Sequence, residues 1–177
     1  MTRAQIVLSL LTIVSSGLVS AVVTFRLNAG RDSRRMRREK LEAAFLAHSG
    51  FLRQLDVGWY PYYAVMGGEI EYNDALDLAI GKGTAAEPKH FETLAMLVSL
   101  YFPELQSGFA RLVGIRDRAA TLIQAHKNDY KRVGPHVSAA RDEMKRLIDA
   151  LTAHEAQFNA DMASLARKLG ASGKQAA

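Results

Sequence analysis

The chain has 177 residues, 49% of them hydrophobic, which is enough for one ordinary domain and an additional apolar segment. It contains no cysteine, and this excludes a disulfide framework, thiolate catalysis and cysteine-ligated zinc or iron–sulfur sites. The net charge of +5 is typical of nucleic-acid-binding proteins only when the positive charge covers a domain surface. Here residues 1–40 carry eight basic and two acidic side chains, and residues 41–177 carry 15 basic and 16 acidic ones. The excess positive charge therefore belongs to one flank and not to a domain surface.

An uncharged run, IVLSLLTIVSSGLVSAVVTF, occupies residues 6–25. A helix of this length spans about 30 Å, the thickness of the hydrocarbon core of a bilayer. We therefore expect a transmembrane helix at 6–25, with residues 1–5 as a short external N-terminus. A buried core helix is disfavoured because globular helices of this length usually carry a polar face. A cleaved signal peptide is disfavoured because the run is long for a signal and a dense group of cations follows it.

A basic juxtamembrane segment follows the run at residues 26–40. Lys and Arg near the ends of a spanning helix are retained on the cytoplasmic side. The sequence thus predicts a single-pass signal-anchor protein of the cell inner membrane, in a membrane of bacterial type, with its N-terminus outside and its C-terminal domain cytoplasmic. Cations at this position lie near anionic lipid headgroups. The expected membrane-surface residues are Arg26, Arg31, Arg34, Arg35, Arg37, Arg38 and Lys40. Nucleic-acid binding by this segment is disfavoured because no aromatic residues are interleaved with its cations.

A stripe of small and weakly polar residues lies along the predicted span. Such residues let two helices approach closely in lipid, so the stripe predicts association with a second span. An equally good interpretation is that these hydroxyl groups only bond to the carbonyls of their own helix. The residues of the stripe are Thr12, Ser16, Gly17, Ser20, Ala21 and Thr24.

Beyond residue 40 the apolar residues recur at helical spacing, and no segment alternates as a strand does. The predicted fold is all-α: the transmembrane helix is followed by a compact cytoplasmic helical bundle at 41–169 and a flexible tail at 170–177. Gly58 and Pro61 are expected to end the first helix of the bundle. A short helix that starts at Asn73 and stops at Gly81, and a helix from Pro88 to Tyr101, are expected next. An oligomeric coiled coil built from the same stripes is the rival architecture.

The last two helices, from Pro103 to Gly134 and from Pro135 to Leu169, are expected to form a long antiparallel hairpin. The stripe of the first bundle helix is Leu41, Phe45, His48, Leu52, Leu55 and Trp59. The stripes of the hairpin include Leu105, Phe109, Leu112, Ala119, Ile123, Tyr130, Val133, Val137, Ala140, Met144, Leu147, Leu151, Phe158 and Leu165.

Three histidines, His48, His126 and His154, occupy stripe positions, and histidine is a frequent metal ligand. A hairpin that turns at 134–135 places His154 opposite residues 115–116. His126 is then about 15 Å away along the helix. We therefore expect these histidines to pack in the bundle, and we expect no metal site and no cofactor. The acidic side chains of residues 69–77 lack the spacing of a calcium-binding loop and are interpreted as a solvated face.

An aromatic stretch follows the first bundle helix. Tyr and Trp dominate the hot spots of protein interfaces, so the stretch predicts a partner surface, and a corner packed into the bundle is the alternative. The residues of this possible partner surface are Trp59, Tyr60, Tyr62 and Tyr63.

No catalytic sequence motif is present, and the sequence predicts a protein that is not an enzyme. The predicted function is that of a membrane-tethered helical interaction or scaffold protein, an accessory subunit of a membrane-associated complex. Its expected partners are a lipid bilayer with anionic headgroups and either a protein partner or a second copy of the chain, and no nucleic acid is expected. A single-pass sensor or ligand-binding helical bundle is the alternative.

Overall fold

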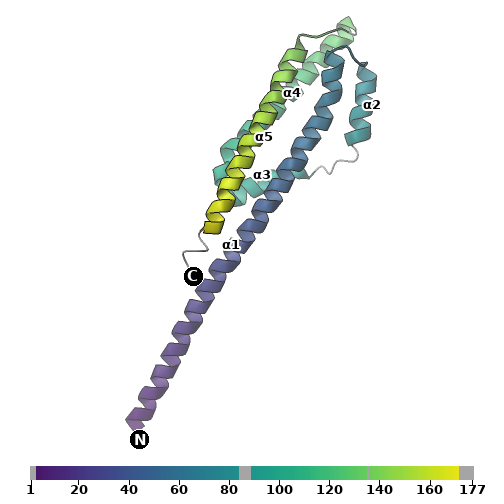
Figure 1. The fold of residues 1–177 in the computed structure, drawn as a ribbon. Helices are drawn as coiled ribbons and strands as arrows, with labels where there is room; N and C mark the ends of the chain where they lie inside the picture. The colour runs from purple at the N-terminus through teal and green to yellow at the C-terminus, as the bar shows by residue number, and fades with distance from the viewer. Residues whose placement is uncertain (1–2, 84–88, 135, 172–177) are drawn as a thin grey trace. The chain divides into compact units, whose positions relative to one another are not determined.

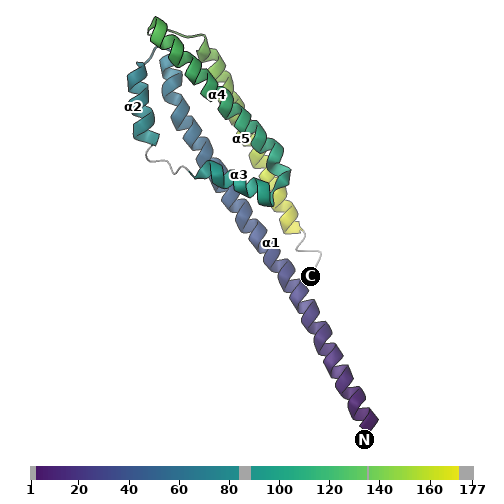
Figure 2. The ribbon, with the colours of Figure 1, turned by 180° about the vertical axis from the view of Figure 1, so that it is seen from behind.

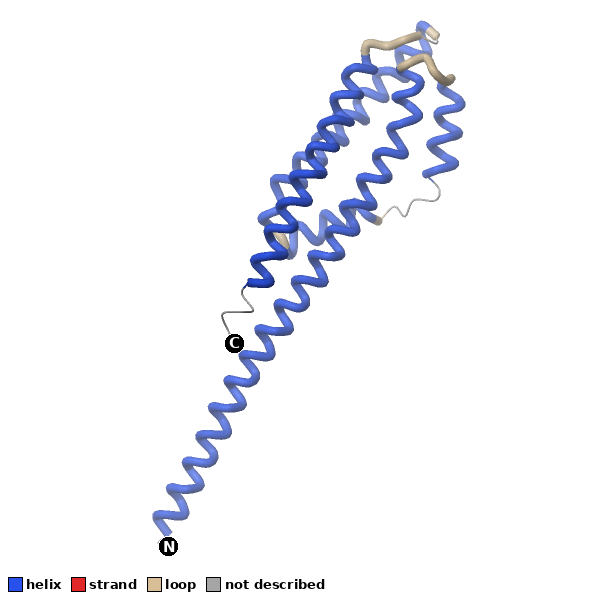
Figure 3. Tube along the Cα trace, viewed as in Figure 1, coloured by secondary structure: helices blue, strands red, loops and turns tan. Residues whose placement is uncertain are grey.

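The computed structural model describes the backbone of residues 3–83, 89–134 and 136–171, and the side chains of 32–80, 89–134 and 136–170. Within this part of the chain there are helices and no strands, which confirms the predicted all-α class (Figures 1 and 3). The helices are α1 (Arg3–Met66), α2 (Tyr72–Gly83), α3 (His90–Tyr101), the 3-10 turn η1 (Pro103–Leu105), α4 (Gln106–Val133) and α5 (Ala140–Ala171).

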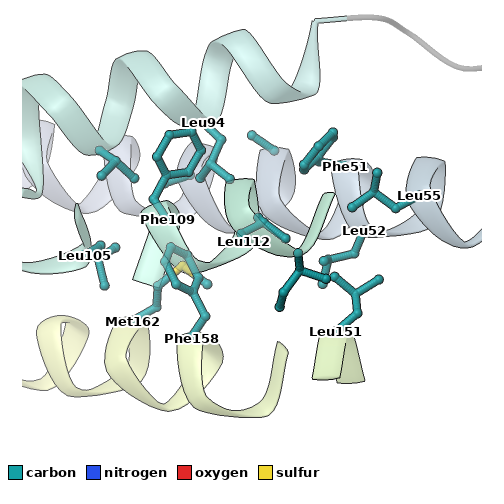
Figure 4. Close-up of a cluster of buried hydrophobic side chains, with 14 of the residues drawn as sticks. Phe51, Leu52, Leu55, Leu94, Leu105, Phe109, Leu112, Leu151, Phe158 and Met162 are labelled. Atoms are coloured by element: carbon teal, nitrogen blue, oxygen red, sulfur yellow. The ribbon is translucent and has the colours of Figure 1, made fainter. Parts of the chain in front are cut away.

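The chain divides into two units, Met1–Glu39 and Lys40–Ala177. The second unit is a helical bundle, as predicted. Its main core is filled by aliphatic and aromatic side chains from α1, α3, η1, α4 and α5 (Figure 4). The labelled members are Phe51, Leu52 and Leu55 of α1, Leu94 of α3, Leu105 of η1, Phe109 and Leu112 of α4, and Leu151, Phe158 and Met162 of α5. A second, smaller cluster forms around Val65, Tyr72 and Ala75 and packs α2 onto the bundle.

The end of α1 differs from the sequence prediction, because the helix continues through Gly58 and Pro61 to Met66. A proline inside a helix removes one backbone hydrogen bond. Here the buried side chains of the following turn, Ala64 to Met66, offset that loss. The helix ends at Met66, and Gly68, two residues beyond, has a φ of +69°, the left-handed conformation that glycine adopts readily. The amide of Gly68 donates to the carbonyl of Val65 at 2.9 Å and the amide of Glu69 to that of Ala64 at 3.0 Å, a Schellman C-cap.

Helices α4 and α5 lie side by side and run in opposite directions in both views (Figures 1 and 2). Helix α4 ends at Gly134, which has a φ of +84°. Helix α5 begins at Ala140 and not at Pro135, because Ser138 supplies its start: the Ser138 hydroxyl accepts from the amide of Ala140 at 3.2 Å. The amide of Ser138 donates to the carbonyl of Met66 at 2.9 Å, which attaches this connection to the end of α1.

Three side chains assigned to the core stripes are instead exposed: Phe45 (44%), Val133 (60%) and Val137 (72%). The two valines lie at the hairpin connection, where the helices end. Phe45 is exposed because the buried face of α1 lies to one side of the predicted stripe and includes Ala44, Ala47 and Phe51.

Helix α3 packs against α1 at Gly50 and Phe51. A Cβ atom added at Gly50 would lie 2.6 Å from Nε2 of His90, so α3 begins directly over α1. Phe51 packs on Phe91 of α3, with ring centroids 5.1 Å apart.

Two glycines of α4 provide a test of how tightly α5 packs. A Cβ atom added at Gly108 would lie 2.7 Å from Cδ2 of Phe158, whereas one added at Gly114 would meet nothing within 4 Å. We expect Gly108→Ala to lower the free energy of unfolding by about 1–2 kcal/mol through overpacking. Gly114→Ala should raise it by about 0.5–1 kcal/mol, because alanine is the better helix former. Urea unfolding of both variants measures these changes, and a stabilising Gly108→Ala would contradict the close α4–α5 contact.

Candidate functional site

The most unusual feature of the core is a layer of three rings that joins α1 to α5: His48, His154 and Phe158. His48 is fully buried and His154 is 3% exposed. Their ring centroids are 5.5 Å apart and the ring planes are 70° apart, an edge-to-face arrangement. The Phe158 ring lies one turn beyond His154 on α5, with its centroid 4.4 Å from that of His48 and 5.3 Å from that of His154. Through its contact with Gly108, the layer also reaches α4.

The imidazole nitrogens of this layer are buried among apolar groups. Both ring nitrogens of His48 and Nε2 of His154 have no hydrogen-bond partner among the described residues. Burial, and secondarily the nearby His154, lowers the pKa of His48 from 6.5 to about 4. Burial also lowers the pKa of His154, where Arg111 acts in the same direction and Asp161 in the opposite one. Both rings are therefore neutral in the folded protein at neutral pH.

A second group of histidines lies where α4 meets the hairpin connection. His136 has its Nδ1 at 2.8 Å from the carbonyl oxygen of Gly134 and its Nε2 at 3.0 Å from a carboxylate oxygen of Asp129. Both partners are acceptors, so the doubly protonated ring satisfies both contacts.

The neighbour of His136, His126 of α4, is in a different environment. Its ring centroid is 6.0 Å from that of His136, and it is 3% exposed. Neither of its nitrogens has a hydrogen-bond partner within the described part of the chain. Burial is the largest cause that lowers the pKa of His126; the nearby His136 lowers it further, and Asp129 opposes both. A buried histidine with a lowered pKa and a partly buried histidine held between two acceptors therefore lie in ring contact at this end of the bundle.

The three buried histidines do not converge on one point. His154 lies near Arg111, about one helical turn from the predicted position opposite 115–116. His126 has Tyr130 and His136 as its ring neighbours, not the layer. Among the described residues no group of three or more His, Asp or Glu side chains is arranged to hold a metal ion.

The carboxylates at residues 69–77 have structural contacts. Glu69 forms an ion pair with Arg141 of α5, and the Arg141 guanidinium also lies over the Tyr63 ring, 5.1 Å from its centroid. The Asp74 carboxylate accepts from the amide of Glu71 at 3.3 Å, at the start of α2.

The aromatic stretch of α1 is divided between the core and the surface. Trp59 is buried, and Tyr63 is partly covered. Tyr62 packs against Tyr72 of α2, with ring centroids 5.9 Å apart, and thereby helps to hold α2 in place. Tyr60 points outward and is 62% exposed, which makes it the accessible member of the predicted partner surface.

Part of the basic segment is described. Arg35 and Arg38 are exposed, and Arg35 pairs with Glu39 at 3.0 Å. Lys40 has its Nζ 5.8 Å from the ring centroid of Tyr101 of α3. The side chains of residues 1–31 lie outside the described residues. They include Arg26, Arg31, the predicted span at 6–25 and the whole small-residue stripe predicted within it.

A search of the described residues finds no helix that is both long enough and apolar enough to cross a membrane. Comparison of the chain with protein-family models, with curated proteins and with solved structures finds no match. The site is therefore interpreted from its geometry alone.

Sequence reasoning placed the three buried histidines on core stripes but missed two features of the site. The contact of His136 with the Gly134 carbonyl is local, and the position of His136 two residues after a glycine that ends a helix is a signal for it. The contact between Gly108 and Phe158 had no local signal, because it depends on the register between two helices.

Proposed function

We propose that this chain is a single-pass, membrane-tethered helical interaction protein with no catalytic role of its own, an accessory subunit of a membrane-associated complex. The observation that carries the proposal is the distribution of charge. A 20-residue uncharged run at 6–25 is followed by seven basic side chains within residues 26–40, while residues 41–177 have a net charge of −1. This is the pattern of a signal-anchor whose cations lie at the cytoplasmic face of an inner membrane.

Within this proposal each part of the chain has one task. The run at 6–25 spans the bilayer and associates with another span through its small-residue stripe. The cations of 26–40 lie against anionic headgroups. The bundle presents its surface to a protein partner, and Tyr60 is the aromatic residue of its stretch that is most exposed.

A photo-crosslinking experiment tests the partner surface. We expect the full chain with Tyr60 replaced by a photoreactive phenylalanine analogue to give a discrete crosslinked product in membranes. The matched control places the same analogue at Glu155, an exposed position on α5. Mass spectrometry identifies the partner or a second copy of the chain. A Tyr60 probe that gives no product, or the same products as the Glu155 probe, would contradict a specific surface at Tyr60.

A sensor is the second candidate function, and the histidine layer is the observation that favours it. Two neutral imidazoles lie in ring contact between helices, and three of their nitrogens have no hydrogen-bond partner in the described part of the chain. Such a pair forms a site that responds to protons.

A further inference from the structure

We infer that His48 and His154 form an acid-sensitive latch between α1 and α5, so that protonation of either ring loosens the docking of α1 on the α4–α5 hairpin. This regulation goes beyond the proposed interaction function and does not depend on it.

The geometry of the layer supplies the first step. His48 belongs to α1 and His154 to α5, so their edge-to-face contact is a contact between the two helices. Phe158 covers both rings and is itself held against α4 at Gly108. A proton that arrives on either imidazole therefore places a charge inside the interface of three helices.

The side chains around His48 and His154 would do little to stabilise a positive charge on either ring. On α5 the nearby carboxylate is Asp161, which favours a charged His154, and on α4 the cation Arg111 opposes it. On α3 the buried side chains Leu94, Leu97 and Val98 are apolar. Its carboxylate Glu92 is exposed, as is Glu104 of η1, and its titratable His90 lies over Gly50 of α1, outside the layer. A second charge on the neighbouring imidazole would add repulsion to the cost of burial.

The direction of the response follows from linkage. In the unfolded or undocked chain a histidine binds a proton below about pH 6.5, whereas folded His48 resists protonation until about pH 4. Between about pH 6.5 and pH 4, the unfolded or undocked chain therefore binds more protons than the docked chain, and the docked state loses stability as the pH falls. As the pH falls through this window, each histidine that stays neutral in the folded chain lowers the folding equilibrium constant by up to about tenfold per pH unit.

Urea unfolding of the full chain in mild detergent at pH 7.5 and pH 5.0 tests the latch. Trp59, the single tryptophan, is buried in α1 and reports on the core, and circular dichroism reports on helix content. Carboxylates also titrate over this range, so the quantity compared is the difference between the wild-type chain and the double variant His48→Leu, His154→Leu. Between the two pH values, the folding equilibrium constant of the wild-type chain should fall at least about 30-fold more than that of the double variant, because His48 alone accounts for about 30-fold and His154 acts in the same direction.

A matched control separates this effect from the general loss of a histidine. His90 of α3 packs over Gly50 of α1 but lies outside the layer. The variant His90→Leu should therefore retain the wild-type pH response. An equal pH response in the wild-type chain and the double variant would overturn the latch, as would loss of the response in His90→Leu.

Nuclear magnetic resonance of the histidine rings in the wild-type chain measures their protonation directly. It tests the inference even if the double variant does not fold. In the nitrogen-15 NMR spectrum of the chain with labelled histidine, the His48 ring should remain neutral at pH 5.5 while Trp59 is buried. A protonated His48 ring in a chain with an intact core at that pH would overturn the inference.

Discussion

Phe158→Ala is expected to lower the free energy of unfolding by about 3–5 kcal/mol, the typical cost of deleting a buried phenylalanine ring. Phe158 is 1% exposed and contacts α1 through His48, α4 through Gly108 and its own helix through His154. The rigid neighbours on three helices limit the collapse of the cavity that the substitution leaves, so the loss should fall within this range and not below it.

Urea unfolding of the full chain in detergent, followed through Trp59, measures this loss. Phe45→Ala is the matched control, since it removes the same ring from an α1 position that is 44% exposed. Its cost should be about 1 kcal/mol, because a half-exposed ring gains less from burial. Equal losses for the two variants would contradict the central position of the layer.

The bundle could be predicted from the sequence because its helices carry regular apolar stripes. Met144, Leu147 and Leu151 of α5 are buried as their spacing predicts. The end of α1 could not be predicted in this way. Local propensity favours a stop at Gly58 or Pro61, but the apolar side chains of residues 64–66 gain more by entering the core than the proline loses.

The site was less predictable than the fold, for a reason that His48 and His154 illustrate. Helical spacing places each on a buried face, but whether the two rings meet depends on the offset between helices far apart in the sequence. The same holds for the pairing of Glu69 with Arg141. It joins residues 41–108, which carry three basic and nine acidic side chains, to residues 109–177, which carry twelve basic and seven acidic ones. Such exposed pairs contribute only about 0–1 kcal/mol each, so the core and not the charge pattern determines the packing.

We propose that one span holds the bundle on the cytoplasmic side of the membrane. A pair of reporter fusions after Ala177 of the full chain tests this topology most directly. The cations of residues 26–40 should keep everything that follows the span in the cytoplasm. We therefore expect a fluorescent reporter that folds only in the cytoplasm to be active, and a phosphatase that is active only after export to be silent. An active phosphatase together with a dark fluorescent reporter would contradict the account.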